Sequence, residues 1–247
     1  MAALAAAAIG AVFTSCAPDM GAHALLSRLG PVAPRLLFAH LQPEPWDTGV
    51  PVAGRIAEVA RGLNSLTYLI ALDAGEPASG IGVPVLRYTD LISQEDEAEF
   101  TWERFPFNHP LFIMFSSGTA GAPKCIVHGA GGTLIEHIKE HRLHCDIRPA
   151  ETIYFHTSCA WMMWNWQLSA LASGAELVLF DGPVQGPDTL WALVERRAIN
   201  VFGTSPAYLE LCEGASFSPR AAFGLTALRA ILSTGSILHD RRFDWVW

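Results

Sequence analysis

Short apolar runs alternate along the chain with stretches in which apolar and polar residues mix at helical spacing. The strand-length runs are typical of buried parallel strands and lie at residues 11–14, 35–39, 66–71, 83–87, 111–115, 125–128, 152–156, 177–180, 201–203 and 228–233. The mixed stretches predict helices at residues 2–8, 20–29, 54–62, 133–144, 161–173 and 189–197. This alternation predicts an α/β fold of layered, mostly parallel sheets flanked by helices.

Glycine, proline and charge mark the segments between these elements. Gly30 with Pro31 is expected to end the second helix, and residues 129–132 are expected to form a turn. Residues 73–104 hold eight acidic residues against two arginines, which predicts a solvated connection around the short strand at 83–87.

Composition narrows the class of protein. The 247 residues are 51% apolar and 16% charged, which favours a globular chain with a large core over a disordered one. The formal net charge of −8 argues against a nucleic-acid partner, because an acidic chain repels the phosphate backbone. An anionic ligand would therefore need a local site built from backbone N–H groups and lysine.

The cysteines and the N-terminus bear on the compartment. The chain has five cysteines at irregular spacing and no C-x-x-C pair, which favours a reducing compartment, and we expect the cytosol. The apolar segment Met1–Val12 is too short for a bilayer, which needs about 20 residues, and no basic residue precedes Arg28. We expect a buried helix leading into a strand and no membrane span; a signal-like segment is the alternative.

The strongest chemical signal is the nonapeptide SSGTAGAPK between two predicted strands, at residues 116–124. Its glycines let the backbone curl so that N–H groups point at one anion, its hydroxyls add donors, and Lys124 adds a positive charge. It is not a Walker A loop, because Cys125 follows the lysine and a strand, not a helix, follows the loop. A turn without a ligand is the alternative on composition alone.

This nonapeptide resembles the phosphate-loop motif of the adenylate-forming enzymes, commonly [ST]-S-G-[ST]-T-G-x-P-K-G, a superfamily that includes acyl-CoA synthetases, luciferases and peptide-synthetase adenylation domains. Ala120 stands where the family usually has Thr, and Cys125 where it usually has Gly. The segments 126–134, 139–144 and 160–166 are similar to the acetoacetate-activating acyl-CoA synthetases. The resemblance implies the large N-terminal domain of such an enzyme.

The resemblance also implies a reaction. Acetoacetate and ATP would form acetoacetyl-adenylate and pyrophosphate, and coenzyme A would then take the acyl group. Mg²⁺ would bridge phosphate oxygens, and the protein itself is expected to hold no metal.

The resemblance assigns the site residues in three groups. Lys124 and Thr119 would be catalytic. The nucleotide-binding residues would be Ser116, Ser117, Gly118, Thr119, Gly121 and Lys124 for the phosphates, with Gly235 and Ser236 along the adenine and ribose; Ile237 stands where relatives often have Pro. Trp161, Met162 and Met163 would line the acid pocket, an environment that suits a small, weakly polar acyl tail.

The extent of the chain raises a further expectation. Residues 1–247 would form a partial AMP-binding domain without the family's C-terminal domain, and the stop at Trp245–Trp247 within an apolar helix suggests a truncated chain. We therefore expect no ligase activity from the chain alone. Two alternatives remain: a non-catalytic nucleotide-binding module derived from a synthetase, and a secreted or membrane protein that uses its apolar N-terminus.

Several other side chains have a structural interpretation beside a functional one. His137, His141 and His144, followed by Cys145, have the spacing of a metal site but are expected on a half-exposed amphipathic helix. Trp164 and Trp166 are expected to pack in the core, because helical spacing turns them away from the acid pocket. His128 either approaches the phosphates or is a buried structural residue.

Overall fold

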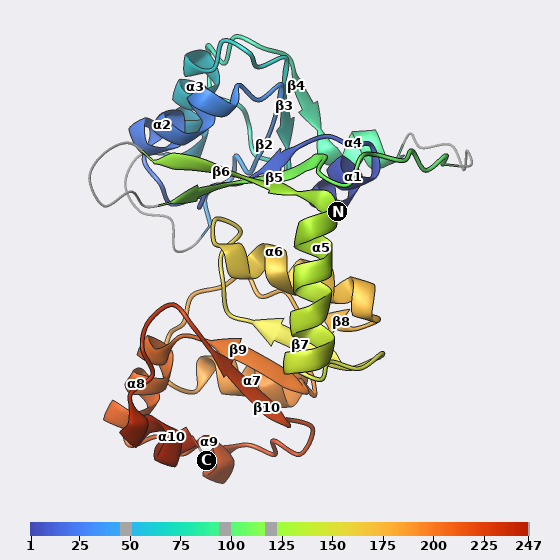
Figure 1. Cartoon of the computed structure of the whole chain (residues 1–247). Helices are drawn as coiled ribbons and strands as arrows, with labels where there is room; N and C mark the ends of the chain where they lie inside the picture. Colours follow the sequence, from blue (N-terminus) through green and yellow to red (C-terminus); the bar gives the residue numbers. More distant parts are fainter. Residues whose placement is uncertain (45–50, 94–99, 117–122, 247) are drawn as a thin grey trace. The chain divides into compact units, whose positions relative to one another are not determined.

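A computed structural model describes residues 1–44, 51–93, 100–116 and 123–246 (Figure 1). The chain forms two compact units, residues 1–130 and 131–247. Each unit is built from sheets and helices, so the predicted α/β class is confirmed. In the described part of the chain, no helix is both long and apolar enough to cross a membrane.

The first unit contains a parallel sheet of order β2-β3-β4, formed by Leu36–Ala39, Tyr68–Ala71 and Val85–Arg87. Helices α2 (Ala22–Val32) and α3 (Val52–Gly62) pack together on this sheet. Their apolar faces meet Leu69 and Ala71 of the central strand, which are nearly inaccessible to solvent. Burial of apolar surface contributes about 25 cal/mol per Å² to stability, and this contribution holds the helices on the sheet.

A second sheet of the first unit has the order β1-β5-β6. Strand β1 (Phe13–Thr14) lies parallel to β5 (Pro110–Ser116), and β5 pairs antiparallel with β6 (Lys124–Gly129). The Thr14 hydroxyl donates to the Ile113 carbonyl oxygen at 2.8 Å, which ties the short first strand to its neighbour. Helices α1 (Ala2–Ala8) and α4 (Tyr88–Ser93) complete the unit.

The second unit is a three-layer arrangement around a parallel sheet of order β10-β9-β7-β8. The strands are Ala230–Ser233, Val201–Thr204, Thr152–Phe155 and Glu176–Leu177. Phe202 of β9 is paired with Tyr154 of β7, and alternate residues of a strand point to opposite faces, so Phe202 and Phe155 lie on opposite faces of the sheet. They belong to two different hydrophobic cores. The segments α6 (Met162–Ser169) and η2 (Ala170–Ser173) cover the Phe155 face, while α7 (Thr189–Arg196) and α8 (Pro206–Gly214) cover the Phe202 face.

Three further helical segments belong to or enter the second unit. Helix α5 (Ala130–Lys139) continues into a π-helical turn, Glu140–His144, and α9 (Pro219–Ala222) and α10 (Asp240–Val246) follow later. Trp245 and Val246 pack against the core formed by α7, β9 and α8.

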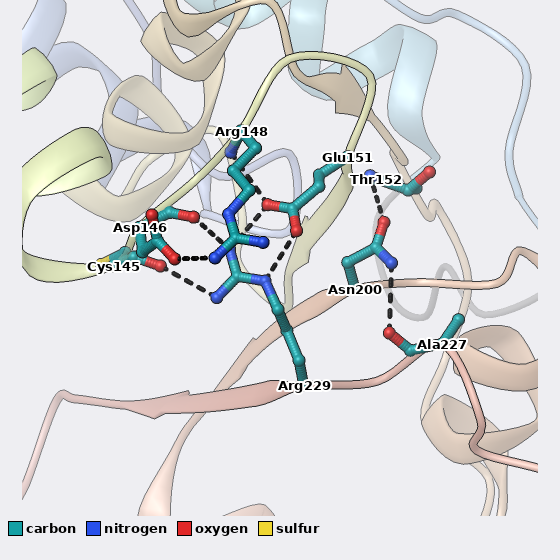
Figure 2. A network of polar contacts seen from close by, with 8 residues as sticks. All are labelled: Cys145, Asp146, Arg148, Glu151, Thr152, Asn200, Ala227 and Arg229. Carbon is teal, nitrogen blue, oxygen red and sulfur yellow. Dashed lines mark hydrogen bonds and ion pairs between the residues drawn. The ribbon is translucent and has the colours of Figure 1, made fainter.

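Polar side chains tie the amino ends of the strands together (Figure 2). Arg229, just before β10, forms two ion-paired hydrogen bonds with Glu151, just before β7, at 2.7 and 2.6 Å. The same guanidinium donates to the carbonyl oxygens of Cys145 and Asp146. The Asn200 amide accepts the Thr152 N–H at 2.8 Å and donates to the Ala227 carbonyl oxygen at 3.1 Å. We call this set of contacts the amino-edge network.

Some predicted boundaries were wrong, and local hydrogen bonds explain why. Helix α2 runs through Pro31 to Val32, because the Ala33 N–H still donates to the carbonyl oxygens of Leu29 and Gly30 in a left-handed terminal residue. The predicted turn at residues 129–132 is instead the end of β6 and the first turn of α5.

Other elements were missed or misjudged in length. Strand β8 ends at Leu177, three residues short of the prediction. Helices α4, α8 and α9 were not predicted. For α8 a signal was present: Ser205 caps the helix by accepting the Tyr208 N–H, and Pro206 opens its first turn.

Candidate functional site

The predicted phosphate loop joins two strands that are paired at its base. Ser116, the last residue of β5, lies directly opposite Lys124, the first residue of β6. The antiparallel ladder therefore holds both ends of the loop, as predicted from the flanking apolar runs. Ser117, Gly118, Thr119 and Gly121, together with Ala120, lie outside the described residues.

Lys124 has the properties that a phosphate ligand requires. Its side chain is exposed, and within residues 1–44, 51–93, 100–116 and 123–246 it forms no ion pair. An ammonium group that no carboxylate neutralises keeps its full charge for an anion. Ser116 is half-buried beside it.

His128 lies further along the same strand and pairs with Phe112. It is four residues beyond Lys124, which at the usual rise of a strand is about 13 Å. It is half-buried. The pairing places His128 at the far end of the hairpin from the loop, so the structure favours the structural interpretation of this histidine.

In the second unit, one predicted acid-pocket residue, Trp161, and one predicted adenine residue, Gly235, follow different strands and lie close together at one edge of the sheet. Trp161 is the last residue of the connection between the carboxyl end of β7 and helix α6, and Gly235 lies in the segment that follows the carboxyl end of β10. A methyl group built on Gly235 would lie 3.3 Å from the Trp161 ring. Ligands of open parallel sheets bind outside the carboxyl ends of the strands, and this edge has that position.

Position 235 requires a glycine for two reasons, its backbone conformation and the side chain beside it. Its φ of +100° lies in the region that side chains avoid, and the indole of Trp161 leaves little room for one. The missing side chain therefore lets the Trp161 ring pack closely against the backbone at Gly235. Ser236, the next residue, is exposed and lines a surface hollow with Pro206, Ala207 and Glu210 of α8 and with Ile237, His239, Arg241 and Arg242.

The three predicted acid-pocket residues differ in exposure. Trp161 is half-buried and packs edge-to-face on Phe155, with ring centroids 6.0 Å apart. Met162 is 40% exposed, whereas Met163 is 9% exposed and belongs to the core with Phe155. Trp161 and Met162 can therefore offer surface to a ligand as they stand, and Met163 packs behind them.

The neighbouring tryptophans fit the packing interpretation to different degrees. Trp166 is 4% exposed and belongs to the same core, which confirms its predicted role. Trp164 is half-buried.

Sequence reasoning missed two hydroxyls at the same edge of the sheet. Thr204 ends β9 and Ser233 ends β10, and they are paired in the parallel register. Both hydroxyl oxygens are buried, and among the described residues neither has a hydrogen-bond partner. A buried polar group without a partner is uncommon and is usually linked to function or to an ordered water. Their position immediately after apolar strand runs was the available signal.

The half-exposed amphipathic helix expected for the histidine segment is confirmed. His137 and His141 are 6% and 0% exposed, whereas Leu134, Ile135 and His144 are exposed. Burial, with the nearby His137 as a smaller cause, lowers the pKa of His141 to about 4, so it is neutral at physiological pH. His137 Nδ1 lies 2.6 Å from the Ser169 hydroxyl oxygen, and His141 packs against Trp166. These contacts belong to helix packing between α5 and α6, and no group of three metal-ligating side chains occurs among the described residues.

Comparison with known proteins agrees with this geometry. The family model described as AMP-binding enzyme matches residues 1–247. Acetoacetyl-coenzyme A synthetase of Rhizobium meliloti is 40% identical over 249 residues, and acetoacetyl-CoA synthetase of Mus musculus is 38% identical over 267 residues. The solved structure of acetoacetyl-CoA synthetase from Streptomyces lividans superposes with a TM-score of 0.90 at 38% identity. Each match covers 99% of this chain and 38% of the other protein, so the chain spans well under half the length of these relatives.

Proposed function

The chain belongs to the AMP-binding enzyme family, and we propose that it supplies the ATP- and acid-binding residues of an acetoacetate–CoA ligase. The family membership implies the use of ATP. Acetoacetate and coenzyme A as the other substrates are supported by the identity of 38–40% to the acetoacetyl-CoA synthetases.

The observation that carries the proposal is the hairpin that pairs Ser116 with Lys124 at the base of the glycine-rich loop; Lys124 is exposed and forms no ion pair with another described residue. This pairing fixes the two positions from which the loop starts and at which it ends. Ser116, Ser117, Gly118, Thr119 and Gly121 would surround the β- and γ-phosphates, and Lys124 would neutralise their charge. Mg²⁺ bound to the phosphates would supply further charge neutralisation.

The first step transfers the adenylyl group. A carboxylate oxygen of acetoacetate forms a bond to the α-phosphorus, the bond from that phosphorus to the bridging oxygen breaks, and pyrophosphate leaves. Lys124 and Thr119 would stabilise the charge that develops on the leaving group. In the second step the sulfur of coenzyme A attacks the acyl carbon, its thiol proton goes to solvent, and AMP leaves.

The walls of the acid site would come from the carboxyl edge of the second sheet. Trp161 and Met162 offer apolar surface to the short acyl chain, with Met163 behind them. The bare backbone of Gly235, with Ser236, would lie along the adenine and ribose. Such positioning of acid and nucleotide lowers the entropic part of the barrier.

The proposal is tested by direct binding to the 247-residue chain. Equilibrium dialysis should detect MgATP binding by the wild type, and Lys124→Ala should weaken it at least about tenfold, because a charged hydrogen bond is worth about 1.5–3 kcal/mol. Lys139→Ala is the matched control: Lys139 pairs with Glu136 on the exposed side of α5, and its loss should leave the affinity unchanged. Equal MgATP affinity of wild type and Lys124→Ala would refute the proposed phosphate site.

A non-catalytic nucleotide-binding module remains the second candidate, because Ala120 removes a hydroxyl that the family motif usually has. The two candidates differ in acid binding. The ligase proposal expects acetoacetate to raise the thermal stability of the MgATP complex, and Trp161→Ala to abolish that increase. A module would bind MgATP and show no response to acetoacetate in either form.

A further inference from the structure

Strand β8 ends before its neighbour β7 does, so the last residues of β7 have no described strand beside them on that side. Strand β8 pairs only with Thr152 and Ile153, and the last backbone bond on that side runs from the Val178 N–H to the Ile153 carbonyl oxygen at 3.0 Å. Alternate residues of a strand bond to the same neighbour, so the next N–H on that side belongs to Phe155. The Phe155 N–H therefore points beyond the last residue of β8, where no strand of the described chain can accept it.

The side chain of Gln167 replaces the missing strand. Its Oε1 accepts the Phe155 N–H at 2.9 Å, in a bond that is buried at both ends, and Gln167 is 2% exposed. Gln167 comes from α6, the helix that packs on this face of the sheet. One side-chain amide therefore joins α6 directly to the last residue of β7.

This hydrogen bond fixes α6 along the strand in a way that apolar packing cannot. Phe155 packs edge-to-face against Trp161 and Trp166, with centroids 6.0 and 6.1 Å apart, but such contacts tolerate small sliding movements. A hydrogen bond depends on both distance and direction and weakens steeply when either changes. The helix begins at Met162, so its height along β7 also sets the position of Trp161.

We propose that Gln167 is a positioning residue for the acid-binding wall: by accepting the Phe155 N–H it holds α6 at one height on β7 and keeps Trp161 beside Gly235. The identity of the ligand at this wall rests on the proposed function. The placement of Trp161 does not, because it concerns contacts within this unit alone. The family motifs identified in the sequence do not include Gln167.

The test replaces Gln167 with a residue of similar size that cannot accept the bond. The chain is labelled with 5-fluorotryptophan, and Trp161→Phe identifies the fluorine resonance of Trp161. In Gln167→Met we expect this resonance to shift in the ligand-free chain. We also expect acetoacetate affinity, measured with MgATP present, to fall at least about tenfold, as misplacement of a binding wall does. MgATP affinity should stay within about twofold of the wild type. Gln167→Glu keeps an acceptor oxygen and should return the resonance towards its original position.

Ser169→Ala is the matched control on the same helix. It removes the contact of 2.6 Å between the Ser169 hydroxyl and His137, which joins α6 to α5 and not to the sheet. It should lower the melting temperature and leave the Trp161 resonance and the acetoacetate affinity unchanged.

The outcomes separate the inference from the proposed function. A lower melting temperature in Gln167→Met with an unmoved Trp161 resonance would show a merely structural hydrogen bond and overturn the inference. A shifted resonance with unchanged acetoacetate affinity would overturn the link to acid binding. A wild-type chain that binds neither MgATP nor acetoacetate would refute the proposed function, and a shifted resonance in Gln167→Met would still support the positioning of Trp161.

Discussion

The polar side chains at the two ends of the β10-β9-β7-β8 sheet differ in whether they have hydrogen-bond partners among the described residues. At the amino ends, Arg229 pairs with Glu151, and the Asn200 side chain bonds to the backbone of Thr152 and Ala227 (Figure 2). At the carboxyl ends, the buried hydroxyls of Thr204 and Ser233 have no partner among the described residues. The same strands therefore end in a saturated polar network on one side and in unsatisfied groups on the other.

This contrast separates stability from binding within one sheet. Saturated, partly buried ion pairs hold strand ends together and leave no capacity for a ligand. The buried hydroxyls of Thr204 and Ser233, which have no partner within the part of the chain that the structure describes, make the other edge less stable than it could be. Such groups are typical of functional sites, where they are kept for a ligand or for ordered water and not for the fold.

The largest expected effect is the loss of the amino-edge network. Arg229→Met keeps the length of the side chain but leaves Glu151 without its partner and two backbone carbonyl oxygens without a donor. Four hydrogen bonds of a charged group are lost together, and the side chains of Arg229 and Glu151 are 29% and 15% exposed, so we expect the free energy of unfolding to fall by about 2–3 kcal/mol. Urea denaturation measures this value. Binding of MgATP should be unchanged in the folded fraction, and weaker binding there would contradict the separation of the two edges.

An effect of intermediate size is expected in the pH dependence of folding stability. The hydrogen bonds from Arg229, the largest cause, lower the pKa of Glu151 below its ordinary value of 4.5. A carboxyl group with a lowered folded-state pKa stabilises the fold fully above its unfolded pKa, and this contribution is lost as pH falls through the folded-state pKa. The stability difference between wild type and Glu151→Gln should therefore be constant from pH 7 to about pH 5 and shrink below about pH 4.5.

Denaturation of both forms across this pH range measures the difference directly. Other carboxylates titrate in both proteins and largely cancel in the comparison. A difference that stays constant down to pH 3 would show that the charge on Glu151 does not stabilise the amino edge.

The smallest expected effect has the opposite sign. Thr204→Val puts a methyl group of similar size in place of a buried hydroxyl to which no other described residue is hydrogen-bonded, and the free energy of unfolding should stay the same or rise by up to about 1 kcal/mol. Thr189→Val is the control, because the Thr189 hydroxyl oxygen accepts the N–H groups of Gln185 and Gly186, and its loss should destabilise by about 1 kcal/mol. Destabilisation of both variants by the same amount would mean that Thr204 is satisfied, for instance by a buried water.

Sequence patterns predicted elements better than they predicted contacts. The apolar runs located the strands of both units, and the glycine-rich nonapeptide was placed correctly between two of them, with Ser116 and Lys124 at its base. Boundaries failed where a tertiary or terminal hydrogen bond decided them, as at Pro31 and at the start of α5. Helical spacing predicted the half-exposed helix that carries the histidines but not the complete burial of His141, because spacing gives the face of a side chain and not how deeply that face is covered.

The sequence by itself determined the α/β class and the two strands that flank the glycine-rich loop. These depend on local periodicity and on residue types within a few positions of one another. Only the tertiary structure decided that Trp161 lies against Gly235 and that Gln167 bonds to Phe155. It also decided that Thr204 and Ser233 lie side by side, with no hydrogen-bond partner for either hydroxyl among the residues described. Such pairs are separated by up to tens of residues, and strand order and register, which no local pattern encodes, bring them together.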